Sequence, residues 1–273
     1  MKFPGLCTTL FLVLFWTFGA GAAQSPELIP FWNTSDESNT RSIDHSSWQE
    51  LLNVYLDAEH ASGIHRFNYA ALKDSEGDQQ SLRKYLVSLT SLDPRQYARQ
   101  EQLAYWINLY NALTVHVVTG RYPVESIREI KSGLFNFGPW DKELIIVQDQ
   151  NLTLNNIEHG ILRPIWRDPR IHYAINCASI GCPNLSPEVY RSDNLERLLE
   201  EGSSDYVNHP RGVSIEGDRL TVSSIFDWWK DDFGSTDEAV LEHLKKYAEP
   251  DLAEQLQKFT KFDDDYDWNL NEP

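Results

Sequence analysis

The stretch EQLAYWINLYNALTVHVV, residues 101–118, decides the fold of this chain. Apolar side chains recur at helical spacing on one side, and further apolar residues occupy the other side: Leu103, Trp106, Tyr110, Leu113 and Val117 against Ala104, Val115 and Val118. A helix that is apolar all round lies inside a core. We therefore predict a long central helix that begins at Asp93 and Pro94 and ends near Gly120.

Two amides interrupt the apolar surface of this helix. Asn108 and Asn111 are three residues apart and project together on one face. Buried amides need hydrogen-bond partners. One interpretation is that they bond to the backbone of a neighbouring loop, and the other is that they contribute to substrate binding.

The flanking sequence predicts more helices and a few short strands. Cap residues and apolar periodicity indicate helices over 47–59, 80–92, 155–163, 186–202, 226–233 and 236–247, a strand over 170–176, and hairpins that turn at 149–151 and 216–218. Strands and helices do not alternate regularly, so the predicted class is α+β. We expect a mostly helical single domain with a few short strands and hairpins over residues 46–273.

The first 23 residues have the pattern of a signal peptide. Lys2 precedes an apolar run at 10–18 and small residues at 19–23, so cleavage is expected after Ala22 or Ala23. Residues 24–45, with several Pro, Ser and Asn, predict a flexible lead-in. No later segment is apolar enough to span a bilayer. We expect an exported protein, periplasmic or secreted, without a membrane span after cleavage.

The composition narrows the expected partners. The chain has 41 acidic and 24 basic residues, a net charge of −17. A nucleic acid partner is not expected, because binding one needs clustered Lys and Arg that neutralise phosphates. The expected partner is an unknown small molecule or a peptide. No cofactor is predicted.

The stretch RIHYAINCASIGCPNL, residues 170–185, holds the two cysteines that remain after signal cleavage, Cys177 and Cys182. In an oxidising compartment they can form a disulfide, and Gly181 and Pro183 supply the turn it needs. Closing so small a loop would contribute about 2 kcal/mol to stability. A metal site is not predicted, because oxidation of exported thiols competes with metal binding.

The remaining interpretation is a reactive thiol. A working cysteine needs a neighbouring imidazole or a helix start that lowers its pKa. His159, on a separate predicted helix, is the expected base for Cys177, with Asn108 or Asn176 to orient it. His172 is the second candidate, although alternate residues of the predicted strand face opposite sides and turn it away from the thiol. For either histidine the alternative is a structural hydrogen bond.

Charged residues gather just before the cysteines. Arg163, Arg167, Asp168 and Arg170 form a cluster with two interpretations. It is either a solvated turn held by pairing of Arg with Asp or, in this acidic chain, the best candidate for binding a carboxylate.

Four motifs, AYWINLYNALTVH, IEHGILR, DPRIHYAINCASIGCP and YDWNLN, resemble in this order the motifs of the family called domain of unknown function number 547, over roughly residues 46–271. The family occurs in exported bacterial proteins and in plant and animal proteins, some of which carry a glutaredoxin domain. That association suggests thiol chemistry. The resemblance implies functional positions at Asn108, Tyr110, Asn111, His159, Arg163, Asp168, Arg170, His172, Asn176, Cys177, Cys182 and Pro183.

Two hypotheses of function follow. The first is a thiol-dependent enzyme that uses Cys177, either a cysteine hydrolase or acyl transferase or a thiol redox protein. The second is a noncatalytic binding module with a permanent disulfide between Cys177 and Cys182. Its anionic ligand would be held by the polar residues of the central helix and the charge cluster: Tyr110, Asn111, Arg163, Asp168 and Arg170.

Overall fold

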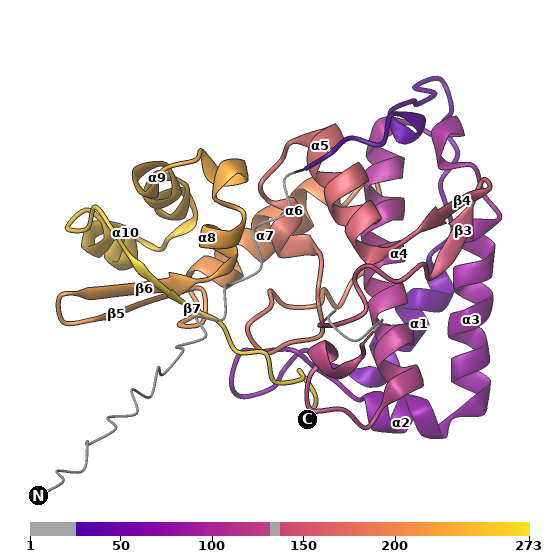
Figure 1. The fold of residues 1–273 in the computed structure, drawn as a ribbon, viewed down its shortest axis with the longest axis horizontal. Coiled ribbons are helices and arrows are strands. Elements are labelled where there is room, and N and C mark those ends of the chain that lie inside the picture. Colours follow the sequence, from indigo (N-terminus) through magenta and orange to yellow (C-terminus); the bar gives the residue numbers. More distant parts are fainter. Residues whose placement is uncertain (1–25, 132–136) are drawn as a thin grey trace, which may run out of the picture.

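The computed structural model describes residues 26–131 and 137–273. Within these residues the chain forms ten α-helices: α1 to α3 lie beside the long helix α4, and α8 to α10 lie at the other end of the molecule (Figure 1). They are α1 (Ser46–Tyr55), α2 (Tyr69–Asp74), α3 (Glu76–Thr90), α4 (Arg99–Arg121), α5 (Arg163–Trp166), α6 (Ile171–Ala174), α7 (Leu195–Val207), α8 (Ile225–Trp228), α9 (Asp237–Tyr247) and α10 (Pro250–Leu256). Shorter helical turns are η1 (Pro30–Trp32), η2 (Pro94–Gln96), η3 (Ile127–Glu129), the π-helix η4 (Asn156–Leu162) and η5 (Lys230–Phe233).

The strands are short and form small sheets. β1 (Leu56–Asp57) pairs with β2 (Arg66–Phe67), β3 (Ile145–Val147) pairs with β4 (Gln150–Leu152), and β5 (Val213–Glu216) pairs with β6 (Arg219–Ser223), all antiparallel; β6 also pairs in parallel with β7 (Asp263–Asp265). The predicted mostly helical, single-domain α+β fold is therefore confirmed. Among the described helices, none combines the length and the hydropathy needed to cross a bilayer.

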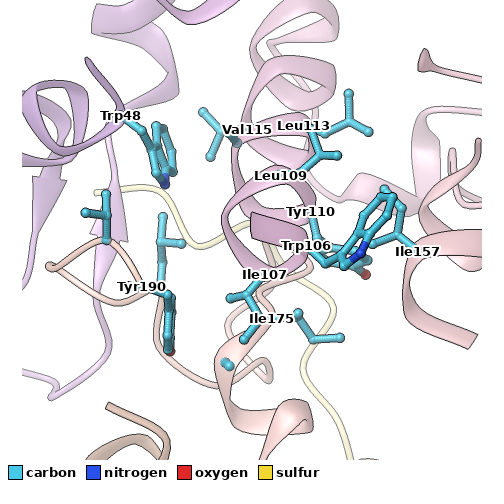
Figure 2. Packing of buried hydrophobic residues seen from close by; sticks show 14 of the residues in the cluster. Trp48, Trp106, Ile107, Leu109, Tyr110, Leu113, Val115, Ile157, Ile175 and Tyr190 are labelled. Atoms are coloured by element: carbon cyan, nitrogen blue, oxygen red, sulfur yellow. The ribbon is translucent and has the colours of Figure 1, made fainter. Parts of the chain in front are cut away.

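Helix α4 is buried along most of its length, as its apolar pattern predicts. Figure 2 shows Trp106 and Tyr110 on the side of Ile157. Trp106 also meets the ring of Trp32 edge-on, with 5.0 Å between ring centroids. Trp32 belongs to the predicted lead-in, so part of that segment packs against the core.

The start of the central helix differs from the prediction. The Asp93 carboxylate accepts a hydrogen bond from the Arg95 N–H, but it caps only the short turn η2. The backbone is extended at Tyr97 and Ala98, and α4 begins after them. Asp93 is therefore a helix cap, as predicted. The helical turn that it caps ends at Gln96 and is not continuous with α4.

The two asparagines of α4 each hold a loop through its backbone. Asn108 donates to Tyr190 O at 2.7 Å and accepts from Tyr190 N at 3.1 Å. Asn111 donates to Ala174 O at 2.9 Å and accepts from Asn176 N at 2.8 Å. All of these groups are buried and need hydrogen-bond partners. The two side-chain amides provide these partners for the backbone of two segments that pass over the helix. Asn111 thereby fixes the chain just before the cysteines.

The predicted strand over 170–176 is wrong, because this segment forms the single-turn helix α6. The Asp168 carboxylate accepts from the Arg170 N–H and starts the turn. Ile171 packs in the core around α4, whereas Tyr173 packs in a second core. A helical turn that is buried on two sides has the same apolar pattern as a buried strand. Because the segment is helical, the alternation of side chains along a strand does not determine the direction of His172.

The second core lies at one end of the molecule, on the left in Figure 1. We call it the C-terminal core, and its buried residues come mainly from β5, β6, α8 and α9, with Tyr173 and Tyr206 from α6 and α7. The hairpin that turns at 216–218 was predicted correctly. Both cores meet at α6, so the segment that leads to the cysteines lies between them.

Several other predicted boundaries are wrong. The helix predicted to begin with Ser47 as its cap begins at Ser46, with His45 as the cap residue. The helix predicted over 186–202 begins only at Leu195, and the one over 155–163 continues past Pro164 into α5, because proline is tolerated in a first helical turn. None of these shifts moves a predicted site residue out of its neighbourhood.

Candidate functional site

The cysteine turn is held in place by one side chain, Asn176. Its amide donates to Pro183 O at 2.7 Å and accepts from the Ala178 N–H at 2.8 Å, so it spans the turn from inside. Ala178 has a φ of 64°, a left-handed conformation that is unfavourable for a residue with a Cβ. Such conformations persist where the surroundings fix them, and they cluster at functional sites.

A C-terminal segment runs alongside this turn. Ile180 N donates to Asn269 O and Gly181 N donates to Asp267 O, both at 2.8 Å. A Cβ on Gly181 would lie 2.9 Å from backbone atoms of Asp267. The glycine is therefore needed for this close approach of the two backbones.

The two thiols are free, so the predicted disulfide between Cys177 and Cys182 is not formed. The Cys182 sulfur accepts the backbone N–H of Cys177 at 2.9 Å. The Cys177 sulfur lies 3.1 Å from both the Ser179 hydroxyl and the Tyr266 hydroxyl. The Cys182 thiol itself donates to Ile175 O at 3.8 Å, so the two side chains are directed to different partners.

The surroundings make the two thiols unequal. The neighbouring Cys182 thiol lowers the pKa of Cys177; burial opposes this shift, and the hydroxyls of Ser179 and Tyr266 add to it. Burial raises the pKa of Cys182, and the neighbouring Cys177 raises it further. Cys177 is half-buried and Cys182 is buried. The pair therefore combines a reachable, more acidic thiol with a protected, less acidic one.

Aromatic side chains lie next to the Cys177 thiol. Tyr266, which contacts the thiol, has its ring centroid 4.6 Å from that of Trp268 and 4.8 Å from that of Trp228. Trp140 packs edge-on against Trp268. All four rings are half-buried, so they present a partly exposed aromatic surface beside the thiol.

His159 lies in a second group of polar residues. It belongs to the π-helix η4, a type of distortion found often at functional sites. Its Nδ1 is 2.9 Å from an Arg163 guanidinium nitrogen, and because arginine only donates, the imidazole accepts there. Burial lowers the pKa of His159, and the nearby Glu158 carboxylate opposes that shift. The ring also packs on Trp229, with 4.5 Å between centroids.

Asp232 connects this group to η5. One of its oxygens, Oδ2, accepts from Arg163 Nε and from His172 Nε2, each at 2.6 Å. Burial would raise the pKa of Asp232, but these two partners outweigh it and lower the pKa to about 2. Tyr110 donates to the neighbouring Glu158 carboxylate at 3.0 Å. The network thus joins the core around α4 to η5, next to the C-terminal core.

The predicted base and nucleophile therefore belong to separate networks. Within residues 26–131 and 137–273, no hydrogen bond joins His159 or His172 to either cysteine. The predicted orienting residue Asn108 bonds to Tyr190, away from both groups.

Two arginines of the predicted carboxylate-binding cluster, Arg163 and Arg170, form ion pairs within the chain. Arg170 bonds to Asp168 at 2.8 Å, to Glu196 at 2.6 Å and to Glu200 at 3.0 Å. Arg163 is paired with Asp232. The geometry agrees with the interpretation of this cluster as turn-stabilising ion pairs.

A surface pocket of about 280 Å³ borders His159. Its other wall is the segment 27–30, in which Glu27 N donates to His159 O and Ile29 N donates to Gly160 O. A Cβ on Gly160 would lie 2.6 Å from Ile29 Cδ1, so a larger residue there would require the Ile29 side chain to shift. As for metals, the described residues contain no group of three or more His, Cys, Asp or Glu side chains that could hold an ion.

Sequence reasoning missed four residues of these networks. Ser179 lies inside the cysteine stretch, and Tyr266 lies in the motif YDWNLN, so the motif could have directed attention to it. Trp229 and Asp232 were assigned only to a predicted helix. No spacing in the sequence indicates that they contact His159 and His172.

Together the fold and the site define a mostly helical α+β protein with a pair of unequal thiols at a constrained turn. Residues 94–207 match the model of the family described as "Protein of unknown function, DUF547". The resemblance predicted from the motifs is confirmed over this segment, which includes α4, η4 and both cysteines. The YDWNLN motif, with Tyr266, lies outside the matched segment. No curated protein and no solved structure matches the chain.

Proposed function

We propose that this protein carries out thiol–disulfide exchange, with Cys177 as the attacking thiol and Cys182 as the resolving thiol. The observation that carries the proposal is the placement of the two thiols. The Cys182 sulfur lies 2.9 Å from the Cys177 backbone nitrogen, and the more exposed Cys177 thiol lies 3.1 Å from the Ser179 and Tyr266 hydroxyls. With Cys182, Ser179 and Tyr266 beside it, the pKa of Cys177 is lowered. Attack on a disulfide requires a thiolate, and resolution requires a second thiol in reach of the first. The arrangement of the two cysteines meets both requirements.

The substrate disulfide is the oxidant in this reaction, and no other reactant is needed. The Cys177 thiolate attacks one sulfur of the substrate, forms a mixed disulfide and releases the other half as a thiolate, which takes a proton from solvent. Cys182 then loses its proton, attacks the Cys177 sulfur and releases the second half as a thiol. The substrate is reduced to two thiols, and the pair is oxidised to a disulfide; the reverse reaction oxidises a dithiol.

Acyl transfer is less well supported by the same geometry. A cysteine hydrolase needs a general acid and base within hydrogen-bond reach of the thiol and the leaving group. His159 contacts Arg163 instead, and Cys177 contacts Ser179 and Tyr266. Thiol exchange needs no such base once the thiolate is present.

The test is a count of reacted thiols in a Cys7→Ser background, so that only Cys177 and Cys182 can react. The reduced protein is treated with bis(2-hydroxyethyl) disulfide and its mass is measured. The native pair should lose two hydrogens and retain no adduct. Cys182→Ala should retain one adduct, because nothing resolves it. Cys177→Ala should react at least about tenfold more slowly, because the remaining thiol is buried and less acidic.

The alkylation rate, measured as a function of pH, tests separately whether the pKa of the Cys177 thiol is lowered. The rate for the native protein should reach half its maximum at a lower pH than that of an ordinary cysteine, about 8.5. Tyr266→Phe removes one donor to the thiolate and should move this midpoint to higher pH. Equal reactivity of the two single-cysteine variants, or a native midpoint at the ordinary value, would overturn the proposal.

We also propose that the protein is exported and that its leader is removed after Ala22 or Ala23. The apolar run and the small residues that follow it support this, since together they match a signal peptide. N-terminal sequencing of protein recovered outside the cytosol should give Ala23 or Gln24 as the first residue. Recovery of exported protein that still begins with Met1 would contradict the proposed cleavage.

A further inference from the structure

We infer that Arg66 and Arg211 form a binding site for a carboxylate beside the cysteine turn, and that the exchange substrate is a small disulfide or thiol that carries this carboxylate. The inference rests on the proposed exchange function for its substrate, but the anion site itself can be tested without any thiol chemistry.

Arg211 lies directly against the cysteine turn. Its guanidinium donates to Ile180 O at 3.1 Å and to the amide oxygen of Asn184 at 2.6 Å, and it lies over the ring of Tyr206. Tyr206 in turn donates to Gly181 O at 2.6 Å. Ile180 is three residues from Cys177, so the two Cα atoms are at most about 11 Å apart. A short ligand can therefore reach from the guanidinium to the thiol.

Arg66 lies near Arg211 and contacts the C-terminal segment that supports the turn. It donates to Glu272 O at 3.4 Å, a long and weak bond, and the adjacent Phe67 N donates to Asn271 O. Burial lowers the pKa of Arg211, and the like charge of Arg66 adds to that effect. The nearby Cys182 and Tyr266 side chains oppose the shift, which shows that Arg211 is within electrostatic range of the thiol pair.

The hydrogen-bonding capacity of both arginines is incompletely used. The Nε atoms of Arg66 and Arg211 are buried and have no hydrogen-bond partner in the part of the chain that the structure describes. Their guanidinium partners are neutral oxygens of Ile180, Asn184 and Glu272. Because a guanidinium presents several donors in one plane, such a pair suits the two oxygens of a carboxylate.

Within the described residues no carboxylate forms an ion pair with either arginine, although Asp205 is near enough to interact electrostatically with Arg211. The arginines of the described chain that form ion pairs are Arg95, Arg163, Arg170, Arg191, Arg197 and Arg219. Asp57 lies opposite Arg66 in the β1–β2 pair, but its carboxylate accepts from Glu59 N. The Glu272 carboxylate accepts from Tyr122. In a chain with a net charge of −17, two half-buried arginines that form no ion pair within the described residues indicate an external anion. They lie near each other, because His65 N, next to Arg66, and the Arg211 guanidinium both donate to the Asn184 side-chain oxygen.

Because the protein carries a large negative charge, its preference between anionic and cationic substrates tests the inference. A net charge of −17 alone would favour a cationic disulfide over an anionic one. A local arginine site predicts the opposite order. The preference between charged substrates therefore separates the local site from the field of the whole protein.

The experiment measures exchange rates with three disulfides of different charge: 3,3′-dithiodipropionate, bis(2-hydroxyethyl) disulfide and cystamine. The native pair should react at least about tenfold faster with the dianion than with the dication, the ratio expected for one hydrogen bond between charged groups. In Arg66→Gln and in Arg211→Gln the ratio of the anionic rate to the neutral rate should fall about tenfold. Arg83→Gln, which removes an exposed arginine of α3, is the charge-matched control and should retain the native ratio.

A binding measurement distinguishes this inference from the exchange function. In the Cys177→Ser, Cys182→Ser protein, calorimetry is performed with suberate, which has the two carboxylates of dithiodipropionate but no sulfur. Suberate binding that is lost in Arg66→Gln supports the anion site even if the exchange assay fails for every disulfide. Exchange that prefers cystamine, or suberate binding that survives both arginine substitutions, overturns the inference. Arg66→Gln is the safer variant if Arg211→Gln does not fold, because the Arg66 side chain makes a single long hydrogen bond to the described part of the chain.

Discussion

Replacing Asn111 by Leu should lower the free energy of unfolding by about 2–6 kcal/mol, because it leaves two buried backbone groups without partners at about 1–3 kcal/mol each. These groups are Ala174 O and Asn176 N, which bond to the amide at 2.9 and 2.8 Å. Leucine is close to asparagine in size, so the loss arises from the missing hydrogen bonds more than from packing. The effect should also reach the thiols, since Asn176 shapes the turn that follows.

Urea unfolding of the native protein and of the variant measures this loss. Asn53→Leu is the matched control, because Asn53 is an exposed residue of α1 and its replacement should change stability little. Alkylation of Cys177 should become faster in Asn111→Leu if the turn loosens. An unfolding free energy equal to that of the native protein would mean that the amide does not hold the loop.

Replacing Asp232 by Asn should lower stability at neutral pH by about 3–5 kcal/mol, the usual cost of removing one partner of a buried ion pair. The carboxylate lies 2.6 Å from both Arg163 and His172, and both of those side chains are buried. An amide keeps the shape of the carboxylate but not its charge. The attachment of η5 to α5 and α6 should therefore weaken.

The acid dependence of stability gives a second readout for Asp232. Its pKa is lowered to about 2 in the folded protein, below the ordinary value near 4. A carboxyl group with a lowered folded pKa contributes stability above its unfolded pKa and loses it as pH falls through the folded pKa. The native protein should thus lose about 2 kcal/mol from this group between about pH 5 and pH 2, and Asp232→Asn should lack that part of the slope. Chemical unfolding at a series of pH values measures it, and parallel curves for the two proteins would contradict the assignment.

The parts of the fold that the sequence predicts are those decided by neighbours in the chain. The all-round apolar pattern of residues 101–118 predicts a central helix, and α4 is one. The turn residues near 217 predict the β5–β6 hairpin, and Thr236 caps α9 by accepting from Ala239 N. The strand predicted over 170–176 fails because its period was ambiguous: α6 is one turn long and is buried between two cores.

The candidate site, like the fold, has features that the local sequence predicts and features that it does not. The importance of Asn111, Asn176 and the cysteine turn could be inferred from residue type and spacing. The contact of Tyr266 with Cys177 joins residues 89 positions apart, and the contact of Asp232 with Arg163 joins residues 69 positions apart. No local pattern encodes such contacts, so the sequence did not indicate that His159 and Cys177 would belong to different networks.

The C-terminal segment that runs along the cysteine turn also sets the order in which the site can be completed. Ribosomes make the chain from its N-terminus, so Cys177 and Cys182 emerge well before Tyr266, Asp267 and Asn269 exist. Until those residues are added, the turn lacks the backbone bonds to Asp267 and Asn269, and the Cys177 thiol lacks the Tyr266 hydroxyl. The thiol therefore gains its full activation only after the 89 residues up to Tyr266 have followed it, which limits its reactivity until that segment has been made.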